Sequence, residues 1–216
     1  MEIFKLPHTT KVNKVIPKNA FDSYTNTKQK KMISELIARI TWLHKLSTDT
    51  INLEAKEIKE IQIFKIELKT KEEIQPLLNI IDKAIPYNII FIVEFEEQVY
   101  LSTSTKHPHP VNEDNAVIDW TFKTSWFLHS ATTHELQLKK NIDAMYLDFC
   151  TQLSAKPTTT YKSLHDLIQY NQQISTLEKE ISQLQQNIKN TKHFKHKVEL
   201  NNLLKKLTKE LKLLLY

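Results

Sequence analysis

The triplet Glu67-Leu68-Lys69 is the clearest catalytic candidate in the sequence. It closes a run of alternating apolar residues, which predicts the end of a β-strand. Nucleases of the PD-(D/E)xK type place such a triplet there, with an upstream acid near it. Their carboxylates hold Mg²⁺, and the lysine orients the attacking water. Asp49 and Glu35 are the upstream acids that could join this group, while the simpler interpretation is a solvated strand end with ordinary charges.

Other catalytic or metal sites have weaker support. A zinc site needs four ligands at fixed spacing, and the chain has one cysteine, Cys150, so we expect exposed histidines and no bound metal. Cys150 follows Phe149 in an apolar stretch, which predicts a core position. A single cysteine cannot form an intramolecular disulfide, and no signal-like apolar segment opens the chain. We therefore expect a cytoplasmic protein.

The composition excludes several enzyme classes. The 216 residues include no glycine, where average usage would supply roughly 15. Without glycine, the chain has no dinucleotide-binding fingerprint, no phosphate-binding loop and no nucleophile elbow. The longest apolar runs are far shorter than the roughly 20 residues of a membrane span, so no membrane contact is expected.

Positive charge is concentrated at both ends of the chain. Residues 1–33 hold seven lysines and two acids, residues 161–216 hold ten lysines and five acids, and the middle is acidic. Because Arg39 is the only arginine, bidentate reading of bases is not expected. Contact with nucleic acid or an acidic partner is predicted for Lys11, Lys14, Lys18, Lys28, Lys30, Lys31, Lys192, Lys195 and Lys197.

The periodicity predicts an α/β domain, with a mixed sheet flanked by helices, over residues 28–156. Residues 1–27, with two prolines, are predicted to form a basic extended arm. The predicted helices are 28–46, 71–85 and 133–153, and the predicted strands are 50–53, 60–69, 87–95, 98–105 and 118–127. Residues 106–117 are predicted to form a loop.

Residues 157–216 are predicted to form a C-terminal helical region that is either a hairpin or one long coiled-coil helix with a stutter. Apolar residues recur there at alternating steps of three and four, with a break in phase between the two halves. The predicted helix-interface residues are Ile174, Leu177, Ile181, Leu184, Ile188, Leu200, Leu204, Leu207, Leu211 and Leu214.

Six segments, spread over nearly the whole chain and in the same order, resemble the domain of unknown function 4391 family of bacteria and archaea. They are LPHTTKVNKVIPK (6–18), ITWLHKLS (40–47), EIQIFKIELK (60–69), IDKAIPY (81–87), FKTSW (122–126) and KVELN (197–201). The resemblance implies no catalytic residue. It implies a partner class, because members accompany helicase and DNA-methyltransferase proteins of restriction-like, anti-phage systems.

The first hypothesis for function is a non-catalytic accessory subunit of a DNA-processing defence assembly, acting by protein contacts with a helicase or DNA methyltransferase. It requires no cofactor. The alternative from another class is the nuclease with Mg²⁺. A further alternative is a homodimer or filament held together by the C-terminal heptads, without a role at DNA.

Overall fold

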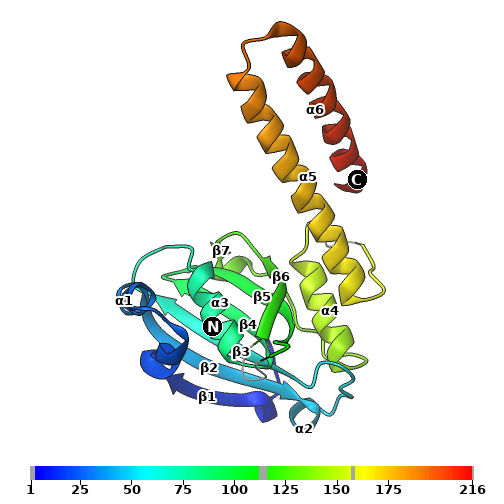
Figure 1. The fold of residues 1–216 in the computed structure, drawn as a ribbon. Helices are drawn as coiled ribbons and strands as arrows, with labels where there is room; N and C mark the ends of the chain where they lie inside the picture. Colours follow the sequence, from blue (N-terminus) through cyan, green and yellow to red (C-terminus); the bar gives the residue numbers. More distant parts are fainter. Residues whose placement is uncertain (1–2, 112–115, 157–158, 216) are drawn as a thin grey trace. The chain divides into compact units, whose positions relative to one another are not determined.

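The structure is a computed structural model that describes residues 3–111, 116–156 and 159–215. The chain divides into two compact units, residues 1–153 and residues 154–216. The first unit is a mixed sheet with helices, and the second is a helical hairpin (Figure 1). This architecture confirms the predicted fold class.

The sheet of the first unit has the strand order β1-β2-β3-β4-β5-β6, with β7 paired to β5. The strands are β1 (Lys11–Ile16), β2 (Ile37–Ser47), β3 (Glu60–Leu68), β4 (Asn88–Phe95), β5 (Gln98–Pro108), β6 (Ala116–Lys123) and β7 (Phe127–Leu128). Within this sheet the β3–β4 pair is parallel, and the other named pairs are antiparallel. The parallel pair follows from the helix between the two strands, since parallel strands need a crossover connection.

The helices of the first unit are α1 (Thr27–Leu36), α2 (Thr48–Ile51), α3 (Gln75–Ala84) and α4 (Ile142–Gln152), with 3₁₀ turns at His8–Thr10, Lys18–Tyr24 and His129–Ala131. Three of these four helices, α1, α3 and α4, contribute buried side chains to the core of the unit. One face of β3 and β4 presents Phe64 and Phe91, whose rings lie 6.3 Å apart. Ile33 of α1 and Leu77 of α3 belong to the same buried cluster. Burying these apolar side chains is the main favourable contribution to the stability of the unit.

The predicted helix over residues 28–46 is wrong in its second half, where the chain forms β2. The capping box between Asn26 and Gln29 starts α1 as expected, but the helix ends at Leu36. The pairing of β2 with β3 shifts register twice, once between Ile37 and Arg39. Each bulge adds a residue to the strand, so apolar residues on one face are no longer two apart. Their spacing therefore imitates helical periodicity.

Four other predicted elements differ from the structure. The predicted arm contributes β1, an edge strand that pairs with β2, and residues 50–53 include the end of α2 instead of a strand. Helix α4 begins at Ile142 because Asn141 caps it, accepting a hydrogen bond from the Ala144 backbone N–H at 2.8 Å. The predicted loop 106–117 overlaps the last residues of β5 and the first of β6, and its residues 112–115 lie outside the described part of the chain.

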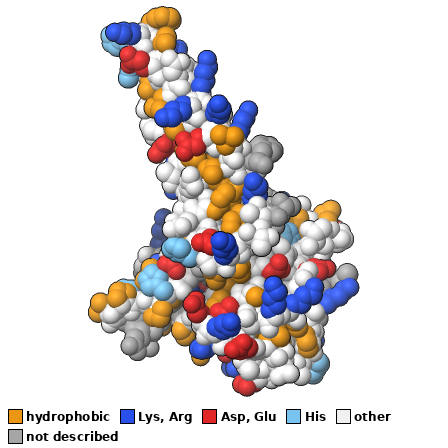
Figure 2. All heavy atoms as spheres, turned by 90° about the vertical axis from the view of Figure 1, so that its right-hand side faces the viewer, with side chains coloured by type: hydrophobic (Ala, Val, Ile, Leu, Met, Phe, Trp, Pro, Cys, Tyr) orange, Lys and Arg blue, Asp and Glu red, His pale blue; other side chains and the backbone are white. Residues whose placement is uncertain are grey.

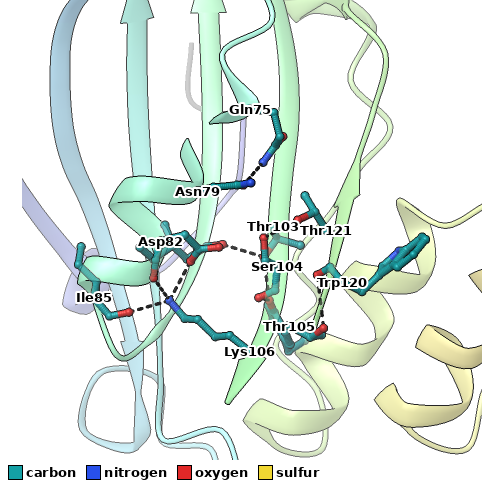
Figure 3. A network of polar contacts seen from close by, with 12 residues as sticks. Gln75, Asn79, Asp82, Ile85, Thr103, Ser104, Thr105, Lys106, Trp120 and Thr121 are labelled. Carbon is teal, nitrogen blue, oxygen red and sulfur yellow. Dashed lines mark hydrogen bonds and ion pairs between the residues drawn. The ribbon is translucent and has the colours of Figure 1, made fainter. Parts of the chain in front are cut away.

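A buried polar track joins α3 to β5 (Figure 3). The Ser102 hydroxyl donates to Gln75 at 3.1 Å, and farther along the helix the Lys106 ammonium lies 2.8 Å from the Asp82 carboxylate. Lys106 also donates to the backbone carbonyls of Asp82 at 2.6 Å and of Ile85 at 2.7 Å. Both side chains of the ion pair are 1% exposed. Burial raises the pKa of Asp82 and lowers the pKa of Lys106, because removal from water disfavours both charged forms.

Helix α4 is tied to the opposite face of β5 through Tyr146. Thr103 lies between two serines that face α3, so its side chain points to the other side of the sheet. The Tyr146 hydroxyl lies 2.8 Å from Thr103 Oγ1 and donates to the Ser104 carbonyl oxygen at 2.8 Å. Tyr146 is fully buried. This hydrogen bond therefore satisfies a polar group that water does not reach.

We expect Tyr146→Phe to lower the free energy of unfolding by about 1–3 kcal/mol, because it leaves the buried Ser104 carbonyl without its side-chain donor. The measurement is urea-induced unfolding at pH 7. Tyr87→Phe, at a side chain that is 42% exposed, is the matched control and should leave stability unchanged. Equal midpoints for wild type and Tyr146→Phe would contradict the role assigned to the hydroxyl.

The carboxylate of Asp143 fastens the segment before β3 to the start of α4. It accepts hydrogen bonds from the backbone N–H groups of Lys56 at 2.9 Å and of Glu57 and Ile58, both at 3.0 Å. Burial works to raise the pKa of Asp143, but the backbone hydrogen bonds outweigh it and leave the pKa lowered. A lowered pKa means that the ionised carboxylate stabilises the folded state.

We expect Asp143→Asn to cost about 1–3 kcal/mol at pH 7, because the amide has one acceptor oxygen in place of two and carries no charge. In the wild type, the ionised Asp143 carboxylate contributes fully to stability above pH 3.8, the ordinary pKa of an aspartate. This contribution is lost as the pH falls through the lowered pKa of the folded state. Thermal unfolding of both proteins at pH 7 and pH 3 checks this. A difference in midpoint that is as large at pH 3 as at pH 7 would show that charge plays no part.

The second unit is an antiparallel pair of helices, α5 (Leu164–Asn190) and α6 (Phe194–Leu215). Ser163 caps α5 by accepting from the Asp166 N–H at 3.1 Å. The Tyr170 hydroxyl donates to the Leu214 carbonyl at 2.7 Å, so the end of α6 lies beside the start of α5. Of the two predicted arrangements, the tail is the hairpin. No helix in the described part of the chain is long and apolar enough to cross a membrane.

Candidate functional site

Glu67 lies at the carboxyl end of β3, directly beside Glu94 of β4 in the register of the parallel pair. The carboxyl ends of parallel strands are where open α/β sheets commonly bind ligands. Both side chains are partly exposed, 33% for Glu67 and 22% for Glu94. The structure therefore pairs the predicted Glu67 with a second carboxylate that the sequence analysis did not single out.

A lysine, an arginine and a histidine surround this pair of carboxylates. The Lys65 ammonium lies 3.5 Å from Glu67 Oε1 and 3.5 Å from Glu94 Oε2. Arg39 Nε lies 3.6 Å from Glu67 Oε2, and His129 Nε2 lies 3.8 Å from Glu94 Oε1. These separations exceed those of good hydrogen bonds, and each exposed pair contributes roughly 0–1 kcal/mol. The cluster is therefore loosely held, and Lys65 and Arg39 balance the charge of the two carboxylates.

A hollow of about 470 Å³ opens beside this cluster and is lined by Lys65, Glu94, Glu96, Glu97, Leu128, His129 and Ser130. Two carboxylates are the kind of ligand that Mg²⁺ uses together with substrate phosphates. However, the described residues contain no group of three or more His, Cys, Asp and Glu side chains placed to hold a metal ion. The protein groups fit a divalent cation only in part, since Lys65 already lies between the carboxylates.

The other predicted catalytic residues, Lys69, Glu35 and Asp49, do not contact this cluster in the part of the chain that the structure describes. The Lys69 ammonium donates to the Ser34 carbonyl at 2.7 Å, at the end of α1. Glu35 is 3.8 Å from Lys31 on the same helix, and Asp49 lies in the first turn of α2. Within the described part of the chain, neither Asp49 nor Glu35 forms a hydrogen bond or ion pair with Glu67, and Glu94 is the carboxylate that lies beside it.

The signal for Glu94 was present in the sequence. Two predicted strands with a helix between them form a βαβ unit, whose strands are parallel and adjacent. Glu67 and Glu94 occupy equivalent places near the ends of those strands. Lys65, two residues before Glu67, is on the same face by strand alternation. Arg39 and His129 could not be placed in this way, because β2 was predicted as a helix and the 3₁₀ turn that contains His129 was not predicted.

The predicted core role of Cys150 is confirmed, since its thiol is fully buried. Burial raises the pKa of the thiol, which keeps it protonated and unreactive. The N-terminal lysines are partly engaged within the fold. Lys30 lies 3.2 Å from Asp22, and burial followed by the charge of Lys69 lowers the pKa of Lys18. Lys11, Lys14 and Lys28 are exposed.

The ten predicted helix-interface residues all lie on α5 and α6, and we call them the seam. Ile174 and Leu177 are buried, at 4% and 6% exposed. The other eight, Ile181, Leu184, Ile188, Leu200, Leu204, Leu207, Leu211 and Leu214, are only half-buried, and none of the described residues of α6 is fully buried. Two helices alone cannot fully bury the apolar ridge of each, so these eight seam residues remain partly open to solvent along the hairpin. Hydrophobic side chains are visible along this unit in Figure 2.

The predicted contact lysines of the tail, Lys192, Lys195 and Lys197, are all exposed around the turn between α5 and α6. Phe194, in the same turn, is 82% exposed. Together these residues give the tip of the hairpin a basic surface with an exposed aromatic ring.

The model of the family described as Domain of unknown function (DUF4391) matches residues 4–211. The chain belongs to this family. The DUF4391 match begins before β1 and ends in α6, so it includes both the Glu67–Glu94 cluster and nearly the whole hairpin. No curated protein and no solved structure matches the chain.

Proposed function

We propose that the protein is a non-catalytic accessory subunit of a DNA-processing assembly and that the open seam of its hairpin holds a partner protein. The observation that carries this proposal is the half-buried state of eight seam residues. Covering a half-exposed leucine contributes on the order of 1 kcal/mol, and a third helix laid along the hairpin would cover several at once. The family resemblance gives the partner class, a helicase or DNA methyltransferase of a restriction-like system.

The charge of the hairpin favours a different chain as the partner over a second copy. Residues 154–216 contain eleven lysines and five acidic residues. Two such units side by side would bring like charges together, whereas an amphipathic helix with acidic flanks would complement them. We therefore do not expect a homodimer. Light scattering of the full chain should give the mass of a monomer.

The test is co-purification of the full chain with a helicase of a restriction-like system, the proposed partner class. Leu184 of α5 and Leu207 of α6 are half-buried seam residues, so Leu184→Ala with Leu207→Ala removes apolar surface from the open seam itself, and far-UV circular dichroism checks that the hairpin stays helical. We expect this variant to recover at least tenfold less helicase. The matched control is Gln173→Ala with Gln186→Ala, at exposed positions of α5, and it should recover the wild-type amount. Equal recovery by all three proteins would contradict the proposal.

The second candidate function is the Mg²⁺-dependent nuclease, and the observation that favours it is the adjacency of Glu67 and Glu94 with Lys65 between them. Incubation of the protein with DNA and Mg²⁺ distinguishes the two candidates. The accessory role predicts no cleavage. Cleavage that is lost in both Glu67→Gln and Glu94→Gln, and kept in Glu35→Gln, would replace the first candidate with the second.

A further inference from the structure

The face of α6 opposite the seam carries a second surface of different chemistry. Phe194, Val198, Lys205, Lys209 and Lys212 follow one another at steps of four, seven, four and three residues, which places them on one side of a helix. We call them the outer stripe. Phe194 is 82% and Val198 43% exposed, and the three lysines are exposed as well. The stripe extends over about 27 Å at the rise of an α-helix.

The positive charge of the hairpin is gathered on this side and at the tip. Residues 189–215 contain eight lysines and two glutamates. None of the eight lysines forms an ion pair among the described contacts, whereas Lys30, Lys31, Lys65 and Lys106 of the first unit are each paired with a carboxylate. The charge of the stripe is therefore available to an external anion.

We propose that the outer stripe and the tip of the hairpin bind single-stranded nucleic acid. A row of lysines without arginine attracts backbone phosphates as point charges and does not read base edges, which suits binding without sequence preference. Phe194 adds a flat, solvent-exposed ring at the end of the row, and bases that are not paired can stack on such a ring. DNA and RNA offer the same phosphate and base chemistry.

This surface is separate from the seam, so the proposal stands independently of the partner-binding proposal. Lys205, Lys209 and Lys212 each lie two residues before a seam leucine, and two residues along an α-helix correspond to a rotation of about 200°. A partner helix on the seam and a nucleic acid on the stripe could therefore bind together. An acidic segment of a protein is the competing ligand, and the test includes it.

The test is fluorescence anisotropy of the full chain with a labelled 20-nucleotide single-stranded DNA, the RNA of the same sequence, the DNA duplex and polyglutamate. We expect Lys205→Gln/Lys209→Gln/Lys212→Gln to weaken single-strand binding at least tenfold at 50 mM salt. The slope of log affinity against log salt concentration should be smaller in magnitude by about 2 for this variant, since each phosphate contact on a single strand contributes roughly 0.7 to the slope. The control Lys56→Gln/Lys83→Gln/Lys139→Gln removes the same charge from exposed positions of the first unit, none of them a predicted contact lysine, and should change binding less than threefold.

Phe194→Ala separates stacking from charge. We expect it to weaken single-strand binding about tenfold and duplex binding less than twofold, because the base faces of a duplex are already stacked. Equal affinity of the stripe variant and its control would overturn the proposal. Tighter binding of polyglutamate than of either single strand would also overturn it and would assign the stripe to an acidic protein. Tighter binding of the duplex than of either single strand would overturn it as well.

Discussion

Lys106→Met is expected to lower the free energy of unfolding by about 3–5 kcal/mol. Methionine has nearly the length of lysine but no donor, so the Asp82 carboxylate would lose its counter-charge while 1% exposed. A buried charge without a partner is among the most destabilising single changes. Two backbone carbonyls at the end of α3 would lose their donor as well. The measurement is guanidinium-induced unfolding at pH 7.

The double variant Lys106→Met/Asp82→Leu tests whether the cost arises from the unpaired charge. Removing both charges leaves apolar groups in an apolar setting. The double variant should therefore lose about 1.5–3 kcal/mol less unfolding free energy than the two single variants lose in sum. Additive losses would mean that the two side chains do not interact in solution, contrary to the 2.8 Å contact.

Phe64→Ala is expected to cost about 3–5 kcal/mol, the usual range for removing a buried phenylalanine. Phe64 is 2% exposed at the centre of the sheet. Its ring lies 6.2 Å from that of Trp42, nearly parallel to it, and 6.3 Å from that of Phe91. The cavity would therefore open between three neighbouring strands, where the backbone cannot close around it.

The matched control for Phe64→Ala is Val15→Ala on the edge strand β1. Val15 is 57% exposed, and surface substitutions of this kind usually change stability by less than about 0.5 kcal/mol. Both variants are measured by the same guanidinium titration. A loss below about 1 kcal/mol for Phe64→Ala would contradict the packing described for this face of the sheet.

Most of the fold follows from periodicity in the sequence. The alternation in residues 60–69 and the continuous apolar run before Phe95 predict β3 and β4, and the steps of three and four in the tail predict the hairpin seam. The strand β2 was missed because its bulges bring Ile37 and Ile40 to one face at a spacing of three. A bulge depends on contacts with the neighbouring strand, which local sequence does not encode.

The candidate sites were likewise predictable from the sequence only in part. Glu67 was predicted from its place at a strand end, and Glu94, 27 positions later, follows from the parallel pairing of two predicted strands, a signal that the sequence analysis did not use. The half-buried state of the seam could not be predicted, because heptad spacing marks apolar positions without giving the number of helices that cover them. Exposure of Phe194 likewise depends on where the hairpin turns.

The proposed function assigns partner binding to the hairpin, and hydrogen exchange tests this assignment most directly. Exchange of the backbone amides is measured for the full chain alone and mixed with a helicase of a restriction-like system, the partner class proposed above. We predict slower exchange in residues 181–188 and 200–211 on complex formation, since covering the seam suppresses local opening of the helices. The ends of β3 and β4 should be unchanged. Unchanged exchange in the hairpin, together with protection confined to residues 65–69 and 92–97, would contradict the account.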